Sequence, residues 1–140
     1  MRAINLDALT LDAVLHGALD GRPVTVLGLA RSGVALARFL HDMGARVTVY
    51  DGRPASQLER FRALLGDRQI ALALGPDVDP AATWAGASLV ATSPSITPDF
   101  PTTEPRLRTA LQALVAGRRG GDLGLPALVS ESDLFLRLCP

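Results

Sequence analysis

The stretch that decides the fold is residues 23–51, PVTVLGLARSGVALARFLHDMGARVTVYD. It begins with a short apolar run rich in valine, which is typical of a buried strand, and it ends with a second such run at Arg46–Tyr50. Between the two runs lie apolar residues at helical spacing, which predict one buried helical face: Leu36, Phe39, Leu40 and Met43. Strand, helix and strand in this order predict two parallel strands joined by a right-handed crossover.

The same alternation continues along the chain. Further strands are expected at residues 70–74, 88–92 and 125–129. Apolar residues at helical spacing predict two more helices, one with Leu58, Phe61, Leu64 and Leu65, and one with Leu107, Ala110, Leu111, Leu114 and Val115. We therefore predict an α/β fold: a single Rossmann-like, doubly wound domain over residues 1–140, with a mainly parallel sheet of about five strands and helices on both faces.

Several smaller expectations concern the ends of helices. A short helix before the sheet is expected to bury one side, made of Leu11, Val14, Leu15 and Ala18. Thr103 is expected to cap the helix that follows it, and residues 118–121 are expected to form a turn. A last helix is expected to open at Ser132 or Asp133, with Glu131 and Asp133 as carboxylates near its N-terminus.

All 14 basic residues of the 140 are arginine, so the chain contains no lysine. This excludes a Schiff base, a buried lysine base and the phosphate-binding lysine of a P-loop nucleotidase. The net charge of +0 and the 4% of aromatic residues argue against nucleic acid as a partner.

Cysteine usage and hydropathy bear on the compartment. The single cysteine, Cys139, rules out an internal disulfide and fits a reducing compartment. No stretch reaches the ~18 consecutive apolar residues of a membrane-spanning helix, and the first residues lack the layout of a signal peptide. We expect a cytoplasmic domain without a membrane partner.

The turn after the first strand reads G-x-A-x-x-G from Gly28 to Gly33, a variant of the dinucleotide fingerprint. Gly28 is expected to make the tight turn, and Gly33 to let the helix approach the strand closely. The N–H groups at the start of the helix form an anion site, so phosphate is the expected ligand. Ala30 places a methyl group where the nicotinamide fingerprint has its middle glycine, which disfavours the usual NAD pose. A plain connection without a ligand is the alternative.

Asp51 ends the second strand eighteen positions after Gly33, where a carboxylate often binds a ribose or a base. Arg53 follows it and offers a planar guanidinium for stacking or hydrogen bonding. A solvated Asp-Gly turn is the alternative. Ser93 lies after the fourth strand, in a proline-rich loop that is expected across the sheet from the first turn.

No set of residues suggests a catalytic site or a metal site. His16 and His41 lie far apart on two predicted helices, and each is expected to be a surface histidine. Cys139 is expected to be a packed thiol rather than a nucleophile. Trp84 is expected to cover an edge of the sheet or a helix.

Four segments together resemble the N-terminal domain of the UDP-N-acetylmuramoyl-L-alanine:D-glutamate ligases, a family of the Mur ligases of peptidoglycan synthesis. They are VTVLGLARSGVALARFL after residue 23, VTVYDGR after residue 46, LVATSPSI after residue 88 and LVSESDLF after residue 127. The resemblance implies that Arg31, Ser32 and Gly33 bind the diphosphate of the substrate, and that Asp51, Gly52 and Arg53 surround its uracil and ribose. Ser93 is implied to contribute from the fourth strand.

The resemblance also implies which parts of the enzyme are elsewhere. The substrate is UDP-N-acetylmuramoyl-L-alanine, and the reaction uses ATP and magnesium in central and C-terminal domains that this chain lacks. The chain alone is therefore expected to bind the substrate without catalysis and to need no cofactor of its own. Two departures stand out: Ser95 replaces the usual glycine after the fourth strand, and Gly52 replaces a hydroxyl residue, so it offers only its backbone.

Two other functions remain open at this point. One is an independent NAD-binding module, against which Ala30 and the lack of a hydride-transfer partner count. The other is a degenerate domain that mediates contacts and binds no small molecule.

Overall fold

One parallel sheet organises the chain in the computed structural model, which describes residues 3–93, 96, 104–122 and 124–138. Five strands lie in the order β3-β2-β1-β4-β5, and all four neighbouring pairs are parallel. The strands are β1 (Pro23–Leu27), β2 (Arg46–Asp51), β3 (Ala71–Leu74), β4 (Leu89–Thr92) and β5 (Ala127–Ser130). The predicted doubly wound α/β fold is confirmed, and the sheet is parallel throughout the described residues.

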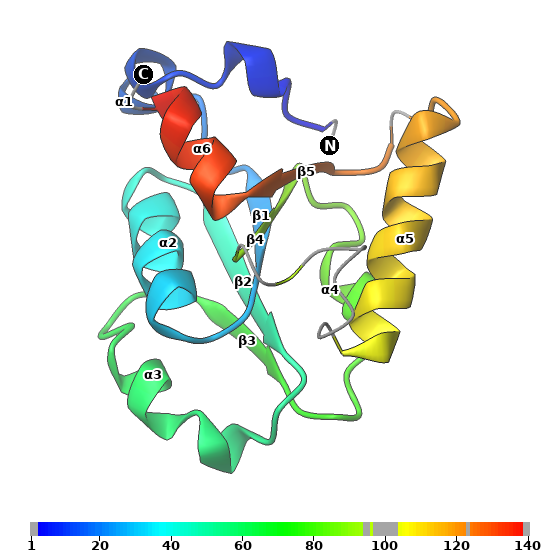
Figure 1. The fold of residues 1–140 in the computed structure, drawn as a ribbon. Helices are drawn as coiled ribbons and strands as arrows, with labels where there is room; N and C mark the ends of the chain where they lie inside the picture. The colour runs from blue at the N-terminus through cyan, green and yellow to red at the C-terminus, as the bar shows by residue number, and fades with distance from the viewer. Residues whose placement is uncertain (1–2, 94–95, 97–103, 123, 139–140) are drawn as a thin grey trace.

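Helices cover both faces of this sheet (Figure 1). One face carries α2 (Arg31–Asp42), α3 (Glu59–Ala63) and α6 (Glu131–Leu138), whose apolar residues join one hydrophobic cluster. The other face carries α4 (Pro80–Thr83) and α5 (Pro105–Arg119) with a second cluster. The remaining helical segments are η1 (Leu6–Ala8), α1 (Leu11–Leu15) and η2 (Ala55–Gln57).

The central strand is β1, and the strand order reverses between β1 and β4. Val24 lies opposite Val47 of β2 on one side and Leu89 of β4 on the other. The chain leaves β1 through α2 towards β2 and returns much later to β4. In open parallel sheets, ligands bind outside the carboxyl ends of the strands at such a reversal.

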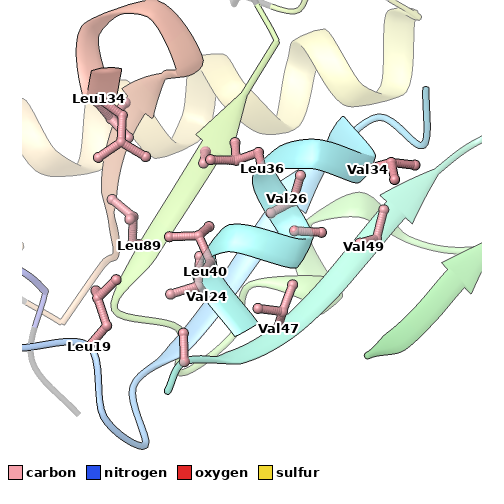
Figure 2. Close-up of a cluster of buried hydrophobic side chains, with 14 of the residues drawn as sticks. Leu19, Val24, Val26, Val34, Leu36, Leu40, Val47, Val49, Leu89 and Leu134 are labelled. Carbon is pink, nitrogen blue, oxygen red and sulfur yellow. The ribbon is translucent and has the colours of Figure 1, made fainter. Parts of the chain in front are cut away.

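In the larger cluster, branched side chains fill the space between the sheet and α2 (Figure 2). Leu36 and Leu40 of α2 pack in one cluster with valines of β1 and β2: Val24, Val26, Val47 and Val49. Each of these side chains is 6% exposed or less, and burying one stabilises the fold by about 1.5–3 kcal/mol. This packing fixes the start of α2 against the end of β1.

The smaller cluster lies under α5. Leu107 and Leu111 of this helix share it with Leu27, Tyr50 and Trp84. Trp84 is 5% exposed and contributes to the core of this face, in keeping with its predicted covering role.

The prediction that the first helix buries one apolar side is wrong. Of the four residues predicted to form that side, only Val14 is buried, while Leu11, Leu15 and Ala18 are exposed. The helix ends after five residues, and Gly17 (φ +93) turns the chain, so that Leu19 takes the next buried position.

Three boundaries also differ from the expectations. The described residues place Glu104 at the N-cap of α5, and Thr103, the expected cap, lies outside the described residues. Residues 118 and 119 continue α5, where basic side chains interact favourably with the carboxyl end of a helix, and the turn follows them. α6 begins at Glu131, directly after β5, with Glu131 and Asp133 in its first turn as predicted.

Candidate functional site

The turn between β1 and α2 has the two glycine features that its sequence predicts. Gly28 has φ +100, a left-handed conformation that a side chain disfavours, and its N–H donates to the carbonyl of Tyr50 at 2.7 Å. At Gly33, a Cβ atom would overlap the carbonyl oxygen of Gly28. The helix therefore approaches the strand as closely as the backbone allows.

The start of α2 has no side-chain cap. Ala30 is its N-cap residue, with extended backbone (φ −135, ψ −173), and it makes no side-chain hydrogen bond to the helix. Its carbonyl accepts the first helical bond, from Val34 N at 2.8 Å. The N–H groups at the first helical positions, Arg31, Ser32 and Gly33, have no acceptor within a helix of this geometry. With the helix dipole, these N–H groups form a site that favours an anion.

Asp51 connects this turn to the end of β2. Its Oδ2 accepts hydrogen bonds from Leu29 N and from Arg53 Nη2, both at 2.9 Å. Its Oδ1 accepts from the backbone N of Arg53 at 2.9 Å and from Nε at 3.1 Å. A carboxylate has about four acceptor positions, so these bonds occupy all of them. Arg53 Nη2 also reaches the carbonyl of Leu29, at 3.3 Å, which completes the link.

These hydrogen bonds keep the ion pair charged. Burial raises the pKa of the Asp51 carboxyl, but the bonds from the side chain and backbone of Arg53 and from Leu29 N hold it below its ordinary value. The pKa of Arg53 is raised by its hydrogen bond to Asp51. The side chain of Asp51 is 9% exposed and that of Arg53 is 49% exposed, so the solvent-facing partner of the pair is the cation.

A cleft of about 490 Å³ lies at this end of the sheet. Ten residues line it: Gly28, Ala30, Tyr50, Asp51, Gly52, Arg53, Ser93, Ile96, Glu104 and Leu107. A smaller hollow of about 170 Å³ between α2 and α6 is lined almost wholly by apolar side chains and lacks comparable polar groups. The cleft at the end of the sheet is the candidate site, because it lies at the carboxyl ends of β1, β2 and β4, where open parallel sheets bind ligands.

Four of the predicted site residues line the cleft together: Asp51, Gly52, Arg53 and Ser93. The other three, Arg31, Ser32 and Gly33, are the first residues of α2, next to the turn that forms one wall. Ser95 lies outside the described residues, as does Cys139.

Glu104 forms part of the cleft wall, and sequence reasoning missed it. Its carboxylate accepts from Arg106 N at 3.0 Å and from Leu107 N at 2.9 Å, so it caps α5. Burial raises its pKa, but these backbone bonds outweigh the effect and hold the pKa below its ordinary value. Pro105 is the feature of the sequence that indicates Glu104 as the cap, because proline is favoured just after a helix cap.

Tyr50 is a second lining residue that the sequence did not single out. It is 1% exposed and belongs to the cluster under α5. Burial, and after it the negative charge of Glu104, raises the pKa of the Tyr50 phenol. The phenol is therefore neutral over the physiological pH range and can donate a hydrogen bond.

The remaining candidates lie apart from the cleft. His16 is the C-cap residue of α1 and His41 lies in the last turn of α2, so each is a helix-end histidine without a role at the site. Within the described residues there is no group of three His, Cys, Asp or Glu side chains that could hold a metal ion. Nor does any described helix have the length and hydropathy to cross a membrane.

The chain is similar to known ligases in sequence. It shares 39% of 98 aligned residues with the UDP-N-acetylmuramoylalanine–D-glutamate ligase of Trichlorobacter lovleyi, covering 70% of this chain and 21% of that protein. With the protein of the same name from Halalkalibacterium halodurans it shares 31% of 119 residues, covering 79% and 23%. The chain thus spans about a fifth of the length of these relatives.

Two further comparisons add little to this. No protein-family model matches the chain. Among solved structures, apo D-lactate dehydrogenase from Escherichia coli aligns with 82% of this chain and 39% of its own, at a TM-score of 0.44 and 16% identity.

Proposed function

This chain is a relative of the UDP-N-acetylmuramoylalanine–D-glutamate ligases, and we propose that it is the domain that binds the UDP part of UDP-N-acetylmuramoyl-L-alanine. In the whole enzyme, D-glutamate would be joined to this substrate in an ATP-dependent step of peptidoglycan synthesis, which serves the cell wall, cell shape and cell division. ATP and magnesium would act in central and C-terminal domains. The chain itself would be cytoplasmic. It would supply a binding cleft and no catalytic group.

The observation that carries the proposal is the uncapped start of α2 beside a cleft, lined in part by charged and polar side chains, at the carboxyl ends of β1, β2 and β4. A diphosphate is a strong hydrogen-bond acceptor, and the first N–H groups of a helix bind such anions. We place the diphosphate at Arg31, Ser32 and Gly33. The hydroxyl of Ser32 and the guanidinium of Arg31 add donors there.

The charges on the cleft wall favour one orientation of the ligand. Glu104 keeps its negative charge and lines the cleft, so it disfavours phosphate in its vicinity. The uncharged uracil and ribose therefore belong between the end of β2 and Glu104, with Gly52, Arg53 and Ser93 around them. Arg53 is half exposed and can stack its planar face on the base.

Asp51 would act on the ligand through other groups. Its acceptor positions are filled by Leu29 N and by Arg53, so the carboxylate holds the turn and the guanidinium in place. A ribose hydroxyl would have to displace one of these bonds to reach it. We propose that Asp51 is chiefly a positioning residue of the uridine end.

Calorimetric titration with UDP-N-acetylmuramoyl-L-alanine, UDP and NAD tests the proposal. We expect saturable binding of the two uridine ligands and little response to NAD. Arg53→Ala should weaken UDP binding by about tenfold, the value of one charge-assisted contact. Arg46→Ala is the matched control, since Arg46 is an exposed arginine at the opposite end of β2. Binding of NAD without any response to UDP would overturn the proposal in favour of a nicotinamide module.

A further inference from the structure

The hydroxyl of Tyr50 is buried and has no hydrogen-bond partner among the residues that the structure describes. Buried hydroxyl groups are normally hydrogen-bonded, because leaving one unpaired costs its desolvation energy. Tyr50 also lines the cleft, and its hydroxyl lies beside Gly52, another lining residue. An unpaired buried group at the wall of a site is one that a bound ligand can satisfy.

Gly52 makes room for this hydroxyl. A Cβ atom at position 52 would lie 3.0 Å from Tyr50 Oη and 3.8 Å from Cζ, closer to the oxygen than side chains ordinarily pack. The absence of a side chain at Gly52 therefore lets the phenol extend along the end of β2, beside the cleft that Glu104 also lines. Tyr50 supplies the hydroxyl, and the missing side chain of Gly52 leaves space for it.

We propose that Tyr50 is a specificity-determining residue that donates a hydrogen bond from Oη to a carbonyl oxygen of the uracil ring. The inference rests on the proposed function, because it assigns a contact within the same cleft. A ring carbonyl is an acceptor without charge, so it tolerates the neighbouring carboxylate of Glu104, whereas a phosphate oxygen does not.

The chain contains one tyrosine, so labelling tyrosine with ¹³C at Cζ yields a single reporter resonance at the hydroxyl. We expect UMP to shift this resonance, and ribose 5-phosphate and pyrophosphate to leave it in place. In calorimetry, Tyr50→Phe should weaken UMP binding by about two- to tenfold, the effect of losing one neutral hydrogen bond. Pyrophosphate binding should be the same in both proteins.

Ser88→Ala is the matched control. Ser88 is also fully buried, and its hydroxyl has no hydrogen-bond partner within the described part of the chain, but it lies just before β4, at the end of the sheet away from the cleft. We expect this variant to bind UMP like the original chain. Gly52→Ala provides a second perturbation: it should weaken UMP binding by displacing Oη, and it should have little further effect when Tyr50→Phe is already present.

The outcomes separate the two proposals. If the chain binds UDP and UMP while Tyr50→Phe binds UMP equally well, the role of Tyr50 is overturned and the proposed function stands. If ribose 5-phosphate, which has no base, also shifts the resonance, the assignment of the contact to the base is overturned. If no uridine ligand binds the original chain, the proposed function fails and the contact fails with it.

Discussion

Gly33 of α2 packs against the carbonyl oxygen of Gly28 with no room for a Cβ atom between them. This contact joins the two ends of the turn that forms one wall of the cleft. It fixes the distance between β1 and the start of α2, and therefore the place where the first N–H groups of the helix point.

Gly33→Ala should lower the free energy of unfolding by about 3 kcal/mol, because the added methyl group meets rigid backbone. Chemical denaturation measures the change. Gly120→Ala is the control: Gly120 has right-handed helical backbone and its nearest atoms are 3.4 Å and 3.5 Å from a Cβ, so stability should change little. Equal stability of the two variants would contradict the close contact.

Asp51→Asn should destabilise the protein by about 2 kcal/mol at neutral pH, since an amide replaces one acceptor oxygen and the ion pair with Arg53 is lost. The effect should depend on pH with a definite sign. The pKa of Asp51 is lower in the folded state than its ordinary 3.8, so its stabilisation is present above pH 3.8 and is lost as the pH falls through the folded value.

Denaturation of both proteins across this acid range checks that sign. The difference in unfolding free energy between the original chain and Asp51→Asn should shrink below pH 3.8. A difference that grows in acid would mean that the carboxylate is not the stabilised form.

Ser32→Glu separates helix stability from ligand binding. A carboxylate in the first turn interacts favourably with the helix dipole, so the melting temperature should stay the same or rise slightly. The same charge should repel the proposed diphosphate and weaken UDP binding by at least about tenfold. Ser32→Gln, of similar size and without the charge, should retain most of the binding. Unchanged UDP affinity in the glutamate variant would place the diphosphate elsewhere.

Tyr50 should ionise above its ordinary pKa of 10.0, because burial and the charge of Glu104 disfavour phenolate. Ultraviolet difference absorbance follows this residue alone, as the chain has one tyrosine. The unfolded chain loses the proton first as the pH rises, so the protein should lose stability above pH 10.

Tyr50→Phe should remove that loss of stability in base. Near neutral pH, without ligand, the variant should be equally stable or more stable by about 1 kcal/mol, since it deletes an unpaired buried hydroxyl. A clear loss of stability at neutral pH would show that the hydroxyl has a partner in the free protein.

The sequence was sufficient for features that depend on nearby residues. The strands around Gly28, the helix from Arg31 and the close approach of Gly33 follow from spacing within one βαβ unit. The position of Asp51 at the end of β2 also follows from its distance along the chain.

Features that depend on distant elements were not predictable in the same way. Alternation along β2 assigns Tyr50 to one face of the sheet, but the packing of α5 and the missing side chain at Gly52 determine where its hydroxyl lies. All acceptor positions of the Asp51 carboxylate are occupied only because the path of the turn directs the N–H group of Leu29 at it. Glutamate is an uncommon N-cap residue, so the sequence favours the hydroxyl of Thr103 over the carboxylate of Glu104 as the cap of α5.

The strand order has a consequence for how the protein acquires its binding site. β1, α2 and β2 are adjacent in the chain, whereas β4 and α5 join β1 only after long stretches of chain have closed, which is the slow part of folding. The cleft needs groups from both sets, so a ligand should bind only the completed fold. Binding should then raise the melting temperature in proportion to the logarithm of ligand concentration, and thermal shift becomes a direct screen for the natural ligand.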